Sequence, residues 1–155
     1  MSHLKGIVRI KRARFPIIKR LNDFDYQFQP SINQQQIAGF ATMSFLDNQE
    51  NIIFTGSPGV GKTHLSIGLG IEACRQDVRT LFINYHELAA QEKQHSERVM
   101  RRYERYDLLI IDELGYLPIL PEKAKLLFQL INGSYERKLT IITTNVLIKL
   151  GNRSS

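Results

Sequence analysis

Apolar and polar positions recur along this chain with two different periods. Four short runs of large apolar and β-branched residues have the length and composition of strands; they are residues 51–55, 79–84, 107–112 and 139–144. Elsewhere apolar residues recur every three or four positions, which predicts helices over 62–76 and 86–105 and a third that begins at Pro121. Strands that are apolar throughout are typical of parallel sheets, because helices cover both faces. The pattern therefore predicts an α/β domain with a parallel sheet between helical layers.

The first 50 residues contain three further predicted segments. A short helix is expected from Leu4, and it ends before Pro16 because proline disfavours its continuation. Aromatic residues then alternate at positions 24, 26 and 28 in a segment that we expect to be extended. Packing on the core is the favoured role of these rings, and base stacking is the alternative. Ser31 is the expected N-cap of an amphipathic helix that reaches Asn48.

A glycine-rich turn separates the first predicted strand from the helix that follows. The turn matches the P-loop pattern G-x-x-x-x-G-K-[ST] with Gly56, Ser57, Pro58, Gly59, Val60, Gly61, Lys62 and Thr63. Its glycines let successive backbone N–H groups point into one concavity that accepts phosphate. Lys62 would bring a cation to the β- and γ-phosphates, and Thr63 would offer a hydroxyl to Mg²⁺ at the positive end of a helix. The turn therefore predicts a nucleotide phosphate site.

Polar side chains end two of the apolar runs, where parallel sheets bind their ligands. Asp112 and Glu113 follow the third run, and Asn145 follows the fourth. We assign Asp112 to the Mg²⁺ shell and Glu113 to the base that accepts a proton from the attacking water. Asn145 would hold that water or contact the γ-phosphate. The alternative for the acidic pair is two exposed carboxylates at a strand end, but its position after the P-loop favours a site.

Positive charge is concentrated near the N-terminus. The chain of 155 residues has a net charge of +6. The first 20 residues contain no acid and seven bases: Lys5, Arg9, Lys11, Arg12, Arg14, Lys19 and Arg20. We weigh a nucleic-acid partner and a solvated, partly disordered tail equally for this segment.

A second basic stripe lies at helical spacing in the predicted helix 86–105. It consists of Arg98, Arg101, Arg102 and Arg105. A solvated face is the favoured interpretation of this stripe, and a nucleic-acid contact is the alternative.

Several other classes of protein are disfavoured by composition. The single cysteine, Cys74, permits no intramolecular disulfide and is expected to be a buried structural thiol. No apolar run has the length of a membrane span, and residues 1–20 lack the apolar region of a signal peptide. The histidines lack metal-ligand spacing. We therefore expect a cytoplasmic protein without a membrane partner.

Four segments together resemble one protein family. They are GSPGVGKTHLSIGLGIEACRQ, YDLLIIDELGYLP, TIITTN and LNDFDYQFQPS. They resemble the IstB-like transposition helper ATPases of insertion sequences, which are AAA+ relatives of the helicase loader DnaC. The resemblance runs from about residue 5 to residue 145. It implies a P-loop NTPase fold of three αβα layers, with a short helical segment before it.

The same resemblance implies a function and a set of roles. The expected protein is an ATP-dependent oligomer that binds DNA through its basic arm and pore-side residues and assists a transposase. Lys62 and Thr63 would bind ATP and Mg²⁺, Asp112 and Glu113 would be the Walker B pair, and Asn145 would be sensor 1. A helicase-loader role and a hydrolysis-defective nucleotide-binding fragment are the alternatives.

The chain departs from the family pattern in two places. The linker between Leu88 and Asp107 is a few residues shorter, and the ten residues after Asn145 do not resemble the family's continuation. We therefore expect a basic arm over 1–30 and an AAA+ domain over 31–155 that is incomplete, without strand five, an arginine finger or the lid. The resemblance implies a sheet order of 5-1-4-3-2. The absence of strand five would leave 51–55 at an edge, with low solubility or dependence on a partner as the expected result. The absence of an arginine finger would leave ATP hydrolysis weak or absent in this chain alone.

Overall fold

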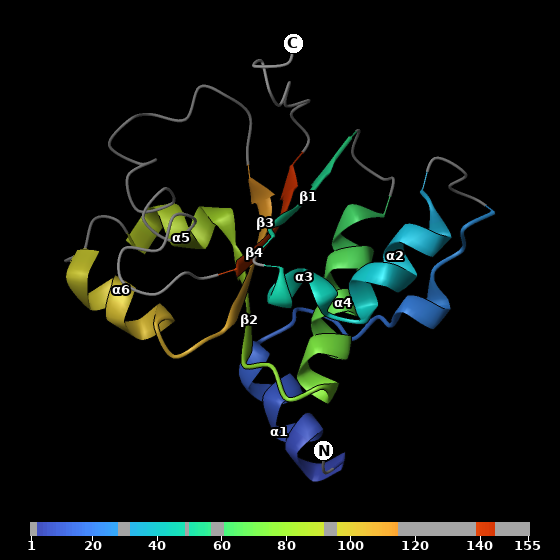
Figure 1. Ribbon diagram of the computed structural model, residues 1–155. Helices are drawn as coiled ribbons and strands as arrows, with labels where there is room; N and C mark the ends of the chain where they lie inside the picture. The colour runs from blue at the N-terminus through green and yellow to red at the C-terminus, as the bar shows by residue number, and fades with distance from the viewer. Residues whose placement is uncertain are drawn as a thin grey trace.

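Four parallel strands form the centre of the structure (Figure 1). The computed structural model describes residues 3–27, 32–48, 50–56, 61–91, 96–114 and 139–144. The strands are β1 (Ile52–Thr55), β2 (Thr80–Asn84), β3 (Leu108–Leu114) and β4 (Leu139–Thr144). Their order in the sheet is β1-β4-β3-β2. All three neighbouring pairs are parallel, so the predicted fold class is confirmed.

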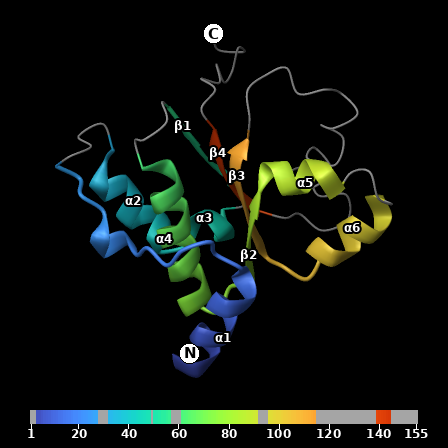
Figure 2. The same cartoon turned by 180° about the vertical axis from the view of Figure 1, so that it is seen from behind.

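Helices cover both faces of this sheet (Figures 1 and 2). One face carries α2 (Gln34–Ala41), α3 (Ser44–Asp47) and α4 (Lys62–Arg75), and the other carries α5 (Tyr85–Gln91) and α6 (Ser96–Tyr103). Successive side chains of a strand point to opposite faces. Leu108 and Ile110 of β3 accordingly pack with the α4 side, and Leu109 and Ile111 pack with the α5 side. The residues of β2 up to Ile83 and Leu108 to Ile111 of β3 are therefore buried on both faces, whereas Ile53 of β1 is 37% exposed.

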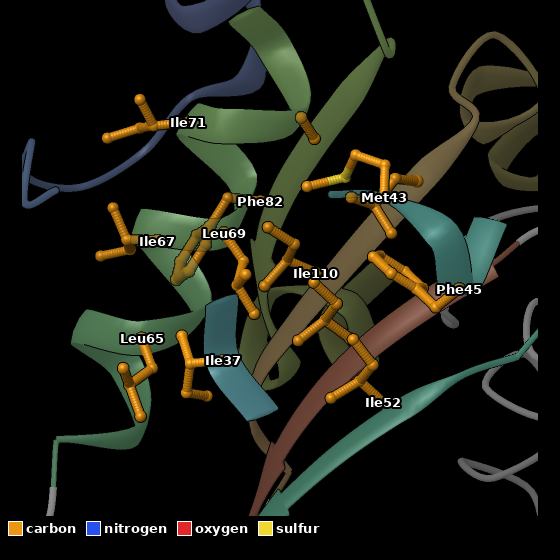
Figure 3. Close-up of a cluster of buried hydrophobic side chains, with 13 residues drawn as sticks. Ile37, Met43, Phe45, Ile52, Leu65, Ile67, Leu69, Ile71, Phe82 and Ile110 are labelled. Atoms are coloured by element: carbon orange, nitrogen blue, oxygen red, sulfur yellow. The ribbon is translucent and has the colours of Figure 1, made fainter. Parts of the chain in front are cut away.

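The larger core lies between the sheet and α4 (Figure 3). Leu65, Ile67 and Leu69 of α4 are fully buried, and Phe45 of α3 closes the cluster near Ile52 of β1. Cys74 is also buried in α4, and burial raises the pKa of its thiol to about 11. A thiol with that pKa is not ionised at neutral pH, which fits the structural role predicted for it.

The N-terminal segment packs onto this core. Helix α1 (His3–Ala13) lies against α4 and β2, with Gly6 and Ala13 buried. After it, Phe15 packs on Phe82 with ring centroids 6.1 Å apart, and the chain crosses α4 to the short 3-10 helix η1 (Leu21–Asp23). Residues 3–27 are thus described as a helix and a crossing segment in contact with the sheet domain.

One predicted helix is interrupted in the structure, and two others fall partly or wholly outside the described residues. The helix expected over 31–48 is wrong in its continuity, because Met43 adopts a left-handed backbone with φ of 65° and separates α2 from α3. Its cap is Asn33, whose side chain accepts from the N–H of Gln36 at 3.0 Å. The helix expected over 86–105 is described as α5 and α6. Ser31 and the helix expected from Pro121 lie outside the described residues.

Within the described ranges, none of the helices has the length and apolar character needed to cross a membrane.

Candidate functional site

The P-loop motif begins where β1 ends and finishes where α4 begins. Gly56 and Gly61 have φ of 142° and 90°, a backbone region that side chains other than glycine rarely adopt. Gly61 also has no room for a Cβ, because the ring of Phe24 packs directly against it. Ser57, Pro58, Gly59 and Val60 lie outside the described residues. The two ends of the loop therefore have the backbone geometry that the motif predicts.

Lys62 opens α4 with its side chain folded back across the loop. Its Nζ donates to the carbonyl oxygen of Gly56 at 2.8 Å, and the residue is only 8% exposed. Burial lowers the pKa of Lys62, and the nearby Asp112 carboxylate opposes that shift. The ammonium is thus held at the mouth of the loop, close to the position that a bound phosphate would need.

Asp112 is a buried carboxylate held by two hydroxyl groups. Thr63 Oγ1 donates to it, at 3.0 Å from Oδ1 and 3.2 Å from Oδ2, and Thr143 Oγ1 donates to Oδ1 at 2.5 Å. Burial raises the pKa of Asp112, hydrogen bonds from Thr143 and Thr63 lower it, Glu113 raises it and Lys62 lowers it. The carboxylate is 3% exposed, so the balance falls toward the raised value.

Thr63 and Asp112 fit the protein side of a Mg²⁺ site. Both offer oxygen atoms, which are the ligands that Mg²⁺ prefers, and the structure places these atoms within hydrogen-bond distance of one another. No group of three or more His, Cys, Asp or Glu side chains that could cage a metal occurs among the residues described. In nucleotide sites of other proteins, phosphates and water complete the Mg²⁺ shell beside one or two protein ligands.

Glu113 is exposed and has a left-handed backbone, with φ of 59°. Its N–H donates to Thr143 Oγ1 at 2.9 Å, where the register between β3 and β4 shifts. Its Oε2 accepts from Asn84 Nδ2 at 2.7 Å, and Asn84 Oδ1 in turn accepts from the N–H of His86. Asn84 therefore links Glu113 to the start of α5.

Asn84 and Thr143 were not among the predicted site residues. Asn84 ends β2 as a polar residue after an apolar run, which is the same signal that identified Asp112. Thr143 gave no such signal, since threonine is common in strands. Its hydroxyl oxygen donates to the carboxylate of Asp112 and accepts from the backbone N–H of Glu113. Only the pairing of β3 with β4 reveals these two bonds.

A cavity of about 450 Å³ opens beside these groups. Its lining includes Thr63, Asn84, Asp112 and Glu113 together with arginine and tyrosine side chains. The structure thus places Thr63, Asp112 and Glu113 at one cavity, with Lys62 close enough to Asp112 for their charges to interact. Asn145 lies outside the described residues, directly after β4.

The aromatic segment that precedes the domain packs beside the P-loop. The Phe24 ring lies 5.2 Å from the His64 ring and 4.9 Å from the Tyr26 ring, measured between centroids. His64 Nε2 lies 2.9 Å from the carbonyl oxygen of Arg20. Phe24 and Tyr26 both pack against the larger core, which confirms the favoured interpretation for these two rings. Phe28 lies outside the described residues.

Comparison with known sequences identifies close relatives of this chain. The sequence profile of a family described as IstB-like ATP binding protein matches residues 4–151. A protein named for ATP binding in insertion sequence IS232 of Bacillus thuringiensis subsp. berliner is 49% identical over 145 residues, which cover 90% of this chain and 58% of that protein. Its counterpart in IS21 of Pseudomonas aeruginosa is 40% identical over 149 residues, covering 92% and 56%. The chain thus spans a little over half the length of these relatives.

Solved structures show the same fold at lower identity. DnaA from Aquifex aeolicus bound to AMPPCP is 22% identical with a TM-score of 0.65, over 86% of this chain and 44% of that one. DnaI gives a TM-score of 0.64 at 22% identity, over 83% of this chain and 73% of that one. The DnaC helicase loader gives 0.57 at 20% identity, over 94% and 84%. The parallel sheet and its helices therefore have the P-loop AAA+ arrangement.

Proposed function

The chain belongs to the IstB-like ATP-binding protein family, and from that premise we propose that it binds ATP with Mg²⁺ and assists a transposase in DNA transposition. The relatives that share 40% and 49% of its residues are named for insertion sequences. Likeness to the helicase loaders is limited to the fold. The balance of these two comparisons favours the transposition role over helicase loading.

The observation that carries the nucleotide site is the convergence of four side chains from two motifs. Lys62 and Thr63 begin α4, and Asp112 and Glu113 lie near the end of β3. The bond between Thr63 and Asp112 joins residues 49 positions apart at the edge where parallel sheets bind ligands. We assign the β- and γ-phosphates to the loop that ends at Gly61, with the ammonium of Lys62 exchanging its bond to Gly56 for one to phosphate.

The protein's own groups have distinct tasks in this proposal. Thr63 Oγ1 and the carboxylate of Asp112 would hold Mg²⁺, which would neutralise charge on the nucleotide phosphates when bound. Glu113 accepts a proton from the attacking water, and Asn145 orients that water. Asn84 donates to Oε2 of Glu113 at 2.7 Å, so this oxygen must give up or share that bond before it can accept the proton. We therefore expect hydrolysis by this chain alone to be slow.

The test is the affinity for ATP of the full chain and of Lys62→Ala, measured by calorimetry with Mg²⁺ present. Loss of a charge-assisted contact to phosphate should weaken binding by about 10-fold to 100-fold. Lys11→Ala removes an exposed lysine of α1 and is the matched control, with unchanged affinity. Equal affinity of wild type and Lys62→Ala would refute the assignment of the loop.

The transposase part of the proposal needs a separate measurement. Co-purification of the chain with the transposase of its own insertion sequence should depend on ATP and should be lost in Lys62→Ala. If the chain associates with the transposase equally well without ATP and in the Lys62→Ala variant, the nucleotide site does not control that association, and the transposase part of the proposal is wrong.

A further inference from the structure

A second cavity, of about 440 Å³, lies at the opposite end of β2 from the nucleotide site. Its lining comes from three parts of the chain: Arg9 and Arg12 of α1, Arg79 and Thr80 at the start of β2, and Arg105 and Tyr106 after α6. Figure 1 shows α1 at the foot of β2, and Figure 2 shows the same from behind. Four arginines from distant parts of the sequence thus surround one space. A stripe of solvated residues on one helix does not explain that convergence.

Two of these arginines are held in place by acids. Arg9 Nε lies 2.6 Å from Asp77 Oδ1. Arg79 forms a fork with Asp107, with Nε 3.0 Å from Oδ2 and Nη2 2.9 Å from Oδ1. An arginine that is already oriented loses less conformational entropy when it binds a further anion.

The other two arginines leave the cavity positive. Arg12 and Arg105 are exposed, and neither has an ion-pair partner in the part of the chain that the structure describes. Four guanidinium groups against two carboxylates give a net charge of +2 around the cavity.

The positive surface extends toward the nucleotide site. Tyr106 lines both cavities. The cavity at the nucleotide site, called the upper cavity below, is also lined by Arg14 and Arg102. The acids Glu87, Asp112 and Glu113 lie with Asn84 and Thr63 among the residues that line the upper cavity. The second cavity, at the start of β2, is called the lower cavity below. It has no acid in its lining, so an anionic ligand is attracted more strongly there than to the upper cavity.

We propose that the lower cavity binds the backbone phosphates of a DNA strand. Guanidinium groups match phosphate oxygens in pairs, and the half-buried Tyr106, which also packs against the core on the α5 side, lines the same cavity. A DNA strand carries a phosphate about every 3.4 Å of its axis. Carboxylates on one face of an extended peptide recur only about every 6.6 Å. Four cations around one cavity therefore fit a nucleic acid better than an acidic peptide.

This inference rests on the proposed transposition role and gives it a DNA contact that involves both α1 and the basic residues near α6. The test compares two double variants of the full chain. Arg12→Gln with Arg105→Gln removes two charges from the cavity. Lys11→Gln with Arg98→Gln removes two exposed charges from the same helix α1 and from α6, outside the lining. Both variants should unfold at the same temperature as wild type.

Binding is measured by fluorescence anisotropy with a labelled single-stranded 20-mer. The cavity variant should bind at least 10-fold more weakly, and the slope of log affinity against log salt should fall by about 1.4, for two phosphate contacts of about 0.7 each. The control variant should lose less than about 2-fold. Equal losses in the two variants, or no loss in either, would overturn the proposal.

Two further arms separate the possible failures. A poly-glutamate peptide that binds the cavity more tightly than the 20-mer, with the same sensitivity to Arg12 and Arg105, would assign the cavity to an acidic protein and overturn the DNA proposal. Lys62→Ala should lose ATP but keep the 20-mer in nucleotide-free buffer. Failure of ATP binding in wild type would therefore contradict the proposed function, while the oligonucleotide result decides the cavity independently.

Discussion

The candidate site places the carboxylate of Asp112 where its charged form is unfavourable. Its carboxylate is almost fully buried, which disfavours the charged form, and the hydroxyls of Thr63 and Thr143 offset only part of that cost. Such a group is retained where a cation or a developing charge needs a fixed anion. A bound Mg²⁺ would supply the missing counter-charge, so the cost in the free protein is consistent with a ligand site.

This cost predicts how stability depends on pH in the nucleotide-free protein. The folded pKa of Asp112 is raised above its ordinary value of 3.8, so the folded state binds the proton more tightly than the unfolded state. Ionised Asp112 therefore destabilises the fold at neutral pH; the penalty begins to shrink as pH falls below the raised pKa and is gone near the ordinary value of 3.8. Asp112→Asn should raise the unfolding temperature at about pH 8, with a gain that shrinks as pH falls toward 3.8.

Thermal unfolding followed by circular dichroism checks this prediction. Asp47→Asn, at an exposed position of α3, controls for the loss of one negative charge and should show no such pH-dependent gain. A lower unfolding temperature for Asp112→Asn at pH 8 would mean that the two hydroxyl bonds outweigh the cost of burial.

A site residue can be predicted from the sequence when the residues next to it in the chain form a recognisable motif or strand end. Asp112 and Glu113 follow an apolar run, and Lys62 and Thr63 complete a motif, so both pairs were predicted. Thr143 was missed because its partners lie on the adjacent strand, 30 and 31 positions away. Asn84 was missed although it ends a strand in the same way as Asp112 does.

At the scale of elements, two glycines in α4 allow the N-terminal segment with Phe15 and Leu21 to pack directly against this helix. A Cβ on Gly68 would lie 2.6 Å from Leu21 Cδ2, and one on Gly70 would lie 2.7 Å from Phe15 Cε1. Two glycines in a helix cost stability in isolation, by roughly 0.5–1 kcal/mol each. Here they allow α4 to contact both the N-terminal segment and the sheet.

Gly70→Ala should therefore destabilise the protein although alanine is the better helix former. The added methyl group meets Ile110 at 2.6 Å and Phe15 at 2.7 Å, and overpacking of this kind costs about 1–3 kcal/mol, less the gain in helix propensity. Gly39→Ala in α2 is the matched control, because nothing lies within 4 Å of its added Cβ. Denaturant unfolding should show a loss for Gly70→Ala and no loss for Gly39→Ala. Equal stability of the two variants would contradict the packing described for α4.

The error in the helix predicted over 31–48 has a physical cause. Apolar spacing continues through 31–48, yet Met43 turns left-handed so that Met43 and Phe45 both reach the larger core. Tertiary packing decides that break, and local sequence does not show it. The strands were predicted within two residues because runs of apolar and β-branched residues mark them in the sequence itself.

At the scale of the whole molecule, β2 runs between two cavities of different character. The cavity at its carboxyl end is lined by three acids and two arginines, and the cavity at its start is lined by four arginines. Sheet order could not come from periodicity; the order implied by the family resemblance agrees with β1-β4-β3-β2 in the described residues. The meeting of α1 with the end of α6 was unpredicted, since about 90 residues separate Arg12 from Arg105 and only the fold joins them.

The central claim is that the P-loop and the acidic strand end form one site for ATP and Mg²⁺. The most direct test is ATP affinity of the full chain with and without Mg²⁺, compared between wild type and Thr63→Val. The account predicts that Mg²⁺ tightens binding by wild type by about 10-fold or more and that Thr63→Val loses most of this gain while still binding free ATP weakly. Wild-type binding that is absent, or that Mg²⁺ leaves unchanged, would contradict the account.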